Sequence, residues 1–516
     1  MLDVLAKWKT WWAAAIFALC VAPTFISYRP YLFRWDDSDY LWRSILVSQG
    51  VWTRNLHKIG AGMVSIRPPA MTLLGLPWGA VTSWDAASRC FITLGWMTAL
   101  FAALCLYLLL RISVKPFYLI VASACVLVSV GPYPAAWVAP SSPTGPFSTH
   151  APATAFLADA LFTWITLAAL LLIPYEARTY APSVAGAITR GILWGVIFSS
   201  GAMTKASFFY FIVAIVPILL VIRFRHAGWR NASAALAALV VSSAPAVIYW
   251  LRWGRLAWEN AKGSSFGATA ALFHISFWHF VGSTLRNSPG LVPSLGLAVA
   301  GLTLAATKKR TVVRGSDFVA MLIMMGFGAV VLVSVNREIR FALPVIVATP
   351  FLVGLLLSGE GGATGGRPAL LATAFVFCSL AVAALPMWHR ADRKSLSRCD
   401  LVLAESARCG AQRILLATDS PTLNLNQMKL AIAASTSQPS LEADTLAYRA
   451  LANLPLAEDF STILESDEVV FQDKDVLSPP YTNQRVSEYE QYTRQLSRSG
   501  PIHVGEDVSV YPLRCR

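Results

Sequence analysis

The stretch RGILWGVIFSSGAMTKASFFYFIVAIVPILLVI, residues 190–222, sets how the chain crosses a membrane, and Lys205 is its only charge after Arg190. The apolar runs on either side of Lys205 can form two membrane spans, or one bent or re-entrant element. Two spans are predicted, because they keep the basic loops that follow on the same side of the membrane as Lys7 and Lys9. A single element would move those loops to the opposite side.

The rest of the chain has the composition of a polytopic membrane protein. Of its 516 residues, 56% are hydrophobic and 14% are charged, and the mean hydropathy is +0.55, which excludes an ordinary soluble protein. Apolar runs of span length predict about eleven helices. They lie at roughly 11–27, 89–110, 116–135, 153–174, 190–204, 206–222, 232–250, 291–307, 317–335, 341–358 and 368–387.

The distribution of charge predicts which side of the membrane each loop faces. With a cytoplasmic N-terminus, the positive-inside rule is satisfied by a set of basic residues in the short loops. This set is Lys7, Lys9, Arg111, Lys115, Arg178, Arg190, Arg223, Arg225, Arg230, Lys308, Lys309, Arg310 and Arg314. The net charge of +14 therefore reflects topology, and no nucleic acid is expected as a partner. We expect a multi-pass protein of the inner (plasma) membrane, surrounded by membrane lipids.

A soluble domain is predicted after Pro386, where charge appears and the apolar runs shorten to strand length. The expected domains are a transmembrane domain at 1–387 and an extracytoplasmic α/β domain at 388–516. The predicted fold class is thus an all-α polytopic membrane domain with a small C-terminal α/β domain. Within this second domain, helices are predicted near 392–408, 422–435, 441–453 and 482–498, and strands near 413–417, 468–472 and 507–513.

Cysteine usage predicts one disulfide in this C-terminal domain, which contains Cys399, Cys409 and Cys515. If 392–408 is one continuous helix, Cys399 and Cys409 lie about 15 Å apart, too far for a bridge. A bridge between Cys515 and either of the others is the better prediction. The remaining cysteines show no metal-ligand spacing, so no metal is expected.

Acidic residues cluster just beyond the first span, in Arg34-Trp-Asp-Asp-Ser-Asp-Tyr40. Ionised carboxylates beside lipid are costly unless water or a polar cavity surrounds them. Because Asp36 and Asp37 are adjacent, their side chains point to different faces, so that one can act as a general base while the other orients or binds. A solvated loop is the alternative interpretation. Arg67-Pro-Pro69 begins a second interfacial element in the same loop.

Two further charges lie on the same predicted side of the membrane. Asp159 opens a long apolar helix, where it is either a functional acid or an anion that the helix dipole stabilises. Lys205 is a point cation that suits a phosphate, or a lysine that extends from a helix end toward the headgroups.

Two arginines, Arg337 and Arg340, lie in a short external loop, contrary to the positive-inside rule. They therefore require an anionic partner, which can be Glu338, Asp36 or a substrate phosphate. The external segment 251–290 is rich in aromatic and ionisable residues and is predicted to be an interfacial loop. Its members include Trp258, His274, His279 and Arg286.

This arrangement resembles the GT-C glycosyltransferases, and within them the protein O-mannosyltransferase and lipid A aminoarabinose transferase group. The resemblance covers roughly residues 11–387. It rests on Trp35-Asp-Asp37 with Tyr40, Leu157-Ala-Asp-Ala-Leu161, the Gly201–Lys205 segment and the Arg337–Pro344 segment. The family often has Asp-Glu where this chain has Asp36-Asp37, and often an arginine where this chain has only His150. These departures leave the subfamily and the sugar open.

The resemblance implies an inverting transfer of a sugar from a polyprenyl-phosphate donor to a lipid, glycan or protein acceptor, without a metal or another cofactor. Asp36 would be the base, while Asp37 and Asp159 orient the acceptor or the base. Lys205, Arg337 and Arg340 would stabilise the departing phosphate. The remaining candidates for acceptor or loop contacts are Tyr40, Arg67, His150 and Trp258. The C-terminal domain would cap the site or select the acceptor.

Two other classes of protein use external charges in a similar way. A lipid flippase or transporter would place ionisable residues near mid-membrane and often contains internal repeats, and neither is clear in this chain. An enzyme of the O-antigen ligase or polymerase type would depend on arginine and histidine, for which His274, His279 and Arg286 are candidates. A non-enzymatic assembly protein would leave Asp36, Asp37 and Asp159 unexplained as a set.

Overall fold

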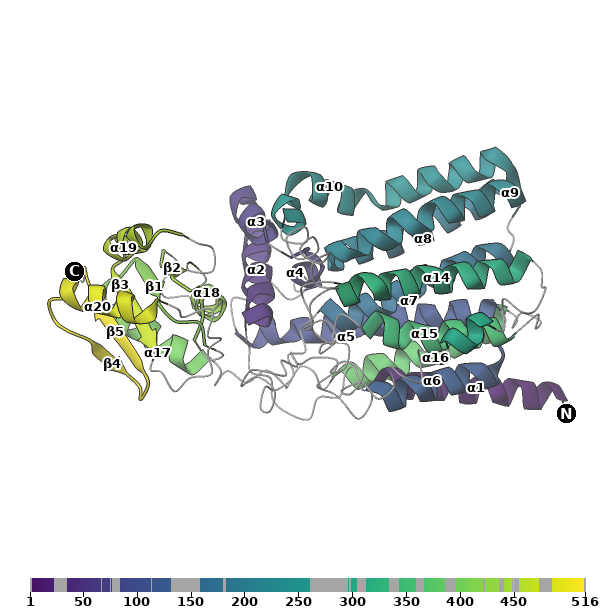
Figure 1. Ribbon diagram of the computed structural model, residues 1–516, viewed down its shortest axis with the longest axis horizontal. Helices are drawn as coiled ribbons and strands as arrows, with labels where there is room; N and C mark the ends of the chain where they lie inside the picture. The colour runs from purple at the N-terminus through teal and green to yellow at the C-terminus, as the bar shows by residue number, and fades with distance from the viewer. Residues whose placement is uncertain are drawn as a thin grey trace.

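The computed structural model shows a helical bundle with a small α/β domain at one end (Figure 1). It describes residues 2–22, 35–65, 67–74, 76, 84–112, 114–130, 158–179, 182–259, 296, 298–303, 312–333, 343–358, 366–385, 396–420, 423–435, 440–447, 449, 454–472 and 485–514. The N-terminus and the α/β domain lie at opposite ends of the bundle (Figure 1). The predicted fold class is therefore confirmed.

The bundle is built around one central helix, α7 (Ala158–Arg178), whose apolar window is 89% buried. Apolar residues occupy every side of its middle, Leu161–Ile173, which is typical of a helix surrounded by others. The other bundle helices are α1 (Leu2–Val21), α5 (Trp84–Arg111), α6 (Pro116–Val130), α8 (Val184–Thr204), α9 (Phe209–Ser242), α14 (Val312–Val333), α15 (Leu343–Ser358) and α16 (Gly366–Ala384). Within the described residues, five helices are long and apolar enough to cross a membrane, so the chain is an integral membrane protein.

The two spans predicted around Lys205 are confirmed. Helix α8 ends at Thr204, Lys205 is extended, and a short 3-10 turn, η4 (Ala206–Phe208), leads into α9. Helix α9 itself contains two segments, because Gly228 at φ 74° and ψ 178° interrupts it in a conformation that only glycine adopts readily. The second segment packs closely on α8, where a Cβ at Gly191 would overlap the carbonyl oxygen of Ala235. It leads into α10 (Ala244–Arg252).

Three short helices form a layer across one end of the bundle (Figure 1). They are α2 (Trp35–Trp52), α3 (Leu56–Met63) and α4 (Ala70–Leu74). Asn55 caps α3 by accepting hydrogen bonds from the backbone of His57 at 3.0 Å and Lys58 at 3.1 Å. The Ser44 hydroxyl on α2 donates to the Thr72 carbonyl on α4 at 2.7 Å. The interfacial element predicted from Arg67 onward thus includes α4 and packs on α2.

The C-terminal domain contains a five-stranded sheet in the order β2-β1-β3-β5-β4. Its strands are β1 (Arg413–Leu416), β2 (Glu442–Thr445), β3 (Glu468–Gln472), β4 (Ile502–Val504) and β5 (Val508–Pro512), and β1, β2 and β3 are parallel. Alternate residues of β1 and β3 enter two separate cores, which cover the two faces of the sheet. Helices α17 (Ser397–Cys409) and α18 (Leu425–Ala434) pack on one face, and α19 (Leu456–Glu465) and α20 (Val486–Leu496) on the other.

Two expectations for this domain are changed by the structure. The helix predicted at 441–453 is wrong at its start, because Glu442–Thr445 forms β2, which pairs in register with Arg413–Leu416. Cys399 is a buried free thiol and Cys409 is disulfide-bonded. The bridge therefore excludes Cys399, and Cys515 lies outside the described residues, as does the predicted domain boundary at 387/388.

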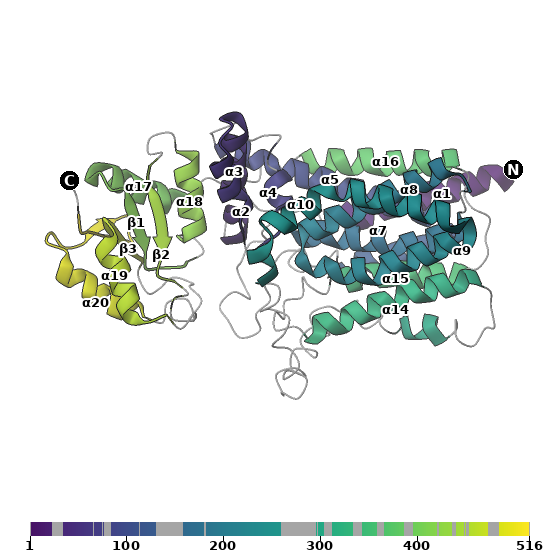
Figure 2. The same cartoon turned by 90° about the horizontal axis from the view of Figure 1, so that it is seen from above.

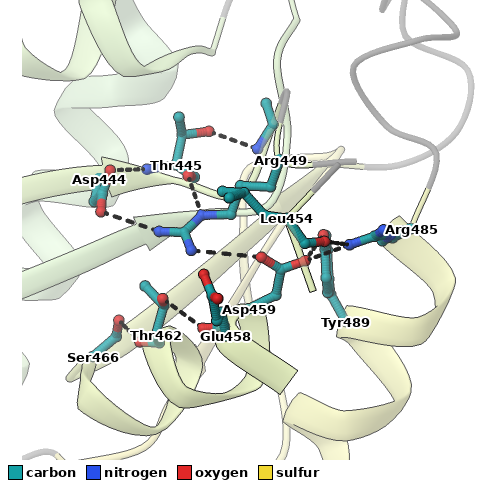
Figure 3. A network of polar contacts seen from close by, with 11 residues as sticks. Asp444, Thr445, Arg449, Leu454, Glu458, Asp459, Thr462, Ser466, Arg485 and Tyr489 are labelled. Atoms are coloured by element: carbon teal, nitrogen blue, oxygen red, sulfur yellow. Dashed lines mark hydrogen bonds and ion pairs between the residues drawn. The ribbon is translucent and has the colours of Figure 1, made fainter. Parts of the chain in front are cut away.

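A buried carboxylate joins α19 and α20 (Figure 3). Asp459 is fully buried, and it accepts hydrogen bonds from the Tyr489 hydroxyl at 2.6 Å and from Arg485 at 3.0 Å. The Arg449 guanidinium lies 3.5 Å from its other oxygen. Such a carboxylate is tolerated in a core because its charge is paired and its oxygens accept hydrogen bonds. This network joins α19, the start of α20 and the segment after β2, and its two arginines are partly exposed.

A second buried carboxylate predicts a pH-dependent stability. Glu468 on β3 is fully buried and accepts a hydrogen bond from the Ser406 hydroxyl on α17, while its other oxygen has no hydrogen-bond partner among the described residues. Burial raises the pKa of Glu468 from 4.5 to about 7. The folded domain therefore binds this proton more tightly than the unfolded chain does. Protonated Glu468 therefore makes its full contribution to the free energy of unfolding below about pH 4.5. As the pH rises from there to about 7, the free energy of unfolding falls by about 3 kcal/mol.

We expect Glu468→Gln to remove this loss, because the amide cannot ionise. Hydrogen exchange of the β3 amides in the full-length protein, corrected for the intrinsic pH dependence, measures the stability at pH 5 and pH 8. Glu488→Gln, at an exposed position on α20, is the control and should retain the wild-type difference. Equal pH dependence in Glu468→Gln and wild type would contradict the assignment.

Candidate active site

Asp36 and Asp37, the predicted base and its neighbour, lie in the first turn of α2. Their side chains are outside the described part of the chain, so their contacts stay predictions. The backbone nevertheless places both at the N-terminus of a helix that lies across the end of the bundle (Figure 1). A carboxylate at that position is favoured by the helix dipole.

One turn along α2, Asp39 forms the first described charge cluster. It is 4% exposed, and its carboxylate accepts a hydrogen bond from Arg43 at 2.8 Å and lies 3.5 Å from Arg67. Arg43 also donates to the carbonyl oxygens of Ala61 and Val64, which fixes α3 against α2. The sequence interpretation gave Asp39 no role, although its spacing of four residues from Arg43 is the helical signal for such a pair.

Arg67 and Tyr40, predicted separately as acceptor or loop contacts, lie together in this cluster. The Arg67 guanidinium is 5.6 Å from the centre of the Tyr40 ring, a cation–π arrangement. The Tyr249 hydroxyl donates to the Arg67 carbonyl at 3.4 Å, which connects α10 to the same loop. Tyr40 is buried, so this end of α2 is a packed surface that Arg67 helps to close.

Asp159 and Lys205 form the second cluster as a direct ion pair. Asp159, in the first turn of α7, is 3% exposed, and the Lys205 ammonium follows the last turn of α8. That ammonium also lies 5.3 Å from the centre of the Phe162 ring. The two residues were predicted to act on different parts of a substrate, and the structure joins them. A buried pair of this kind loses several kcal/mol when only one partner is removed.

The two clusters lie at the same end of the bundle. Met203, two residues before Lys205, packs in one hydrophobic cluster with Val47 and Met63 from the α2–α3 layer and with Tyr249 from α10. Helix α4 also packs against both α5 and α8. The layer that carries Asp36, Asp37 and Asp39 therefore covers the helix ends that carry Asp159 and Lys205.

The remaining candidates lie apart from these clusters or outside the described residues. Trp258 is about half exposed, and its ring lies edge-on to Phe209 at 5.7 Å, with no described contact to either cluster. Arg337, Arg340 and His150 are outside the described part of the chain. Within that part, no group of three or more His, Cys, Asp or Glu residues has the arrangement of a metal site.

A further charge network, which the sequence interpretation missed, lies at the opposite end of α7. Glu176 pairs with Arg190 at 2.9 Å and Arg223 at 3.5 Å, and Arg178 pairs with Asp317. The four helices concerned, α7, α8, α9 and α14, are thereby joined at this end. Asp159 and Arg178 are separated by about 28 Å of helix, close to the thickness of a bilayer core, so the two ends of α7 suit the two headgroup levels.

No family model matches the chain, and no curated protein matches it. Two solved structures of ArnT from Cupriavidus metallidurans are similar to it, one bound to undecaprenyl phosphate and one in the apo state. Each comparison covers 97% of this chain and 97% of the other, with 12% sequence identity and a TM-score of 0.48. ArnT is an aminoarabinose transferase, of the group that the sequence motifs resemble.

Proposed function

We propose that this protein is an inverting membrane glycosyltransferase that transfers a sugar from a polyprenyl-phosphate donor to a lipid, glycan or protein acceptor. The observation that carries the proposal is the pair of charge clusters at the end of the bundle that the α2–α4 layer covers, opposite the end with the Glu176 and Asp317 ion pairs. Two buried clusters, Asp39 with Arg43 and Arg67, and Asp159 with Lys205, lie there beside the helix whose first turn carries Asp36 and Asp37.

The acids supply the means to activate the acceptor. In the proposed reaction, Asp36 takes the proton from an acceptor hydroxyl or amine, whose oxygen or nitrogen then attacks the anomeric carbon. Asp37 and Asp159 orient the acceptor or the base. Asp39 is excluded as the base because its carboxylate is held by Arg43 and Arg67.

The cations supply the means to stabilise the leaving group. As the bond between the anomeric carbon and the phosphate oxygen breaks, its electron pair goes to the phosphate, whose negative charge grows. Lys205, Arg337 and Arg340 are proposed to stabilise that charge. Phosphate bound to lipid is already an adequate leaving group, so the proposed reaction uses no metal.

The membrane part of the proposal concerns sidedness and domain roles. We infer that the protein lies in the inner (plasma) membrane with its N-terminus in the cytoplasm and its C-terminal domain outside. The transmembrane domain at 1–387 would perform the transfer, and the domain at 388–516 would cap the site or select the acceptor. Support comes from the basic residues at one end of the bundle and from the position of the C-terminal domain at the other (Figure 1).

The proposal is tested by incubating purified protein in liposomes with a panel of radiolabelled polyprenyl-phosphate sugars. We expect one donor to be consumed, with release of free polyprenyl phosphate and transfer of label to an acceptor in a membrane extract. Labelled lipid that crosses the bilayer unchanged would instead identify a transporter. Glu465→Gln, which neutralises an acid 63% exposed on the C-terminal domain, should behave as wild type.

A further inference from the structure

The C-terminal domain is docked directly on the helix that carries the proposed base. Helix α18 packs along α2, and the two lie side by side in both views (Figures 1 and 2). Met428 and Ala431 of α18 are buried in the same continuous hydrophobic core as Tyr40 and Leu41 of α2. A movement of α18 is therefore transmitted to α2.

Lys429 lies at the centre of this contact. Its ammonium is 5.4 Å from the centre of the Trp42 ring on α2, and the Arg43 guanidinium is 4.6 Å from the same ring. The described residues give Lys429 no hydrogen bond and no ion pair. A partly buried ammonium without an ion pair interacts with its surroundings mainly through the aromatic face, which is a directional contact.

Charges on both sides fix this ammonium between the two domains. Burial and the nearby Arg43 lower the pKa of Lys429, while Asp444, Asp39 and Glu442 oppose that change. Asp39 belongs to α2, and the other two acids belong to β2 of the C-terminal domain. Lys429 thus interacts favourably with carboxylates of both domains and with one ring of α2, so its position depends on how the domains are docked.

We propose that Lys429 is a positioning residue through which the C-terminal domain holds α2, and with it Asp36 and Asp37, in the geometry required for sugar transfer. Trp42 follows Asp36 by six residues, about 9 Å along the helix axis. A shift of α2 of about 1 Å is sufficient to lower a reaction rate by as much as a hundredfold. This inference rests on the proposed function for its kinetic consequence, but not for the contact itself.

The test compares Lys429→Met, which keeps the apolar stem and removes the charge, with Lys429→Arg, which keeps a cation for Trp42. We expect Lys429→Met to raise the exchange rate of the α2 amides severalfold and to lower kcat between about ten- and a hundredfold, with KM for the donor unchanged. Lys429→Arg should keep both the α2 exchange rate and kcat close to the wild-type values. Lys115→Met, at an exposed lysine immediately before α6, is the matched control and should change neither.

Unchanged α2 exchange in Lys429→Met would overturn the proposal, as would a rise in KM alone. Trp42→Leu removes the ring from the other side of the contact and should reproduce the Lys429→Met result; if Lys429→Met fails to fold, this variant decides the question. The exchange measurement does not depend on turnover, so a wild-type protein without transferase activity would refute the proposed function while the contact is still tested.

Discussion

Asp36→Asn is expected to abolish sugar transfer while the protein still folds and inserts into membranes. A positioned general base contributes about 10²–10⁴-fold to a rate, and an asparagine at this position cannot accept the acceptor proton. Folding should be retained, because Asp36 lies in the first turn of α2, where the amide of asparagine can still interact with free backbone N–H groups. The measurement is the initial rate of polyprenyl-phosphate release at equal concentrations of folded protein.

Asp37→Asn is the companion variant, because it removes the same charge one residue away. A loss of kcat in Asp36→Asn together with a smaller loss in Asp37→Asn supports Asp36 as the base. The opposite order would assign the base to Asp37, and wild-type rates in both variants would refute a catalytic role for this helix end. Lowering the pH should mimic the loss in wild type, since a protonated carboxyl cannot act as a base.

The bundle could be predicted from the sequence because the length and polarity of its helices are local properties. The run from Leu161 to Ile173 is apolar except for two threonines, and in the structure it is the middle of α7, the most buried of the five span-length helices in the described part of the chain. The break at Lys205 could likewise be placed from charge and topology alone, and α8 ends one residue before it. The layer formed by α2, α3 and α4 was only partly anticipated, because short helices at a membrane surface have no span-length signal.

The C-terminal domain shows where local sequence is not sufficient. Residues 442–445 read Glu-Ala-Asp-Thr and carry no strand pattern, yet they form β2 because the backbone of β1 offers a free edge. At the site, the residue types were predictable but not their partners. Asp159 and Lys205 are separated by 46 residues, and only the packing of α7 on α8 brings them together. The Asp39–Arg43 pair, by contrast, is visible from its helical spacing.

Removing the Asp159–Lys205 ion pair in two ways separates its structural role from its catalytic one. Lys205→Met should leave the Asp159 carboxylate, which is only 3% exposed, without the Lys205 ammonium, and should destabilise the protein by about 3–5 kcal/mol. Asp159→Leu should leave the Lys205 ammonium without the Asp159 carboxylate and should destabilise the protein by a similar amount. The double variant replaces both charges with apolar groups of similar size, so most of the lost stability should return. Thermal unfolding in detergent measures all three variants.

Activity should not return with stability in the double variant. If Lys205 stabilises the departing phosphate, the double variant folds but releases polyprenyl phosphate at least about 10²-fold more slowly than wild type, because the growing charge has lost a cation. If the pair only fastens α7 to α8, the double variant transfers sugar at the wild-type rate and the phosphate role moves to Arg337 and Arg340. The decisive quantity is therefore the rate of a stable protein that lacks the pair, since a single replacement changes stability and charge at once.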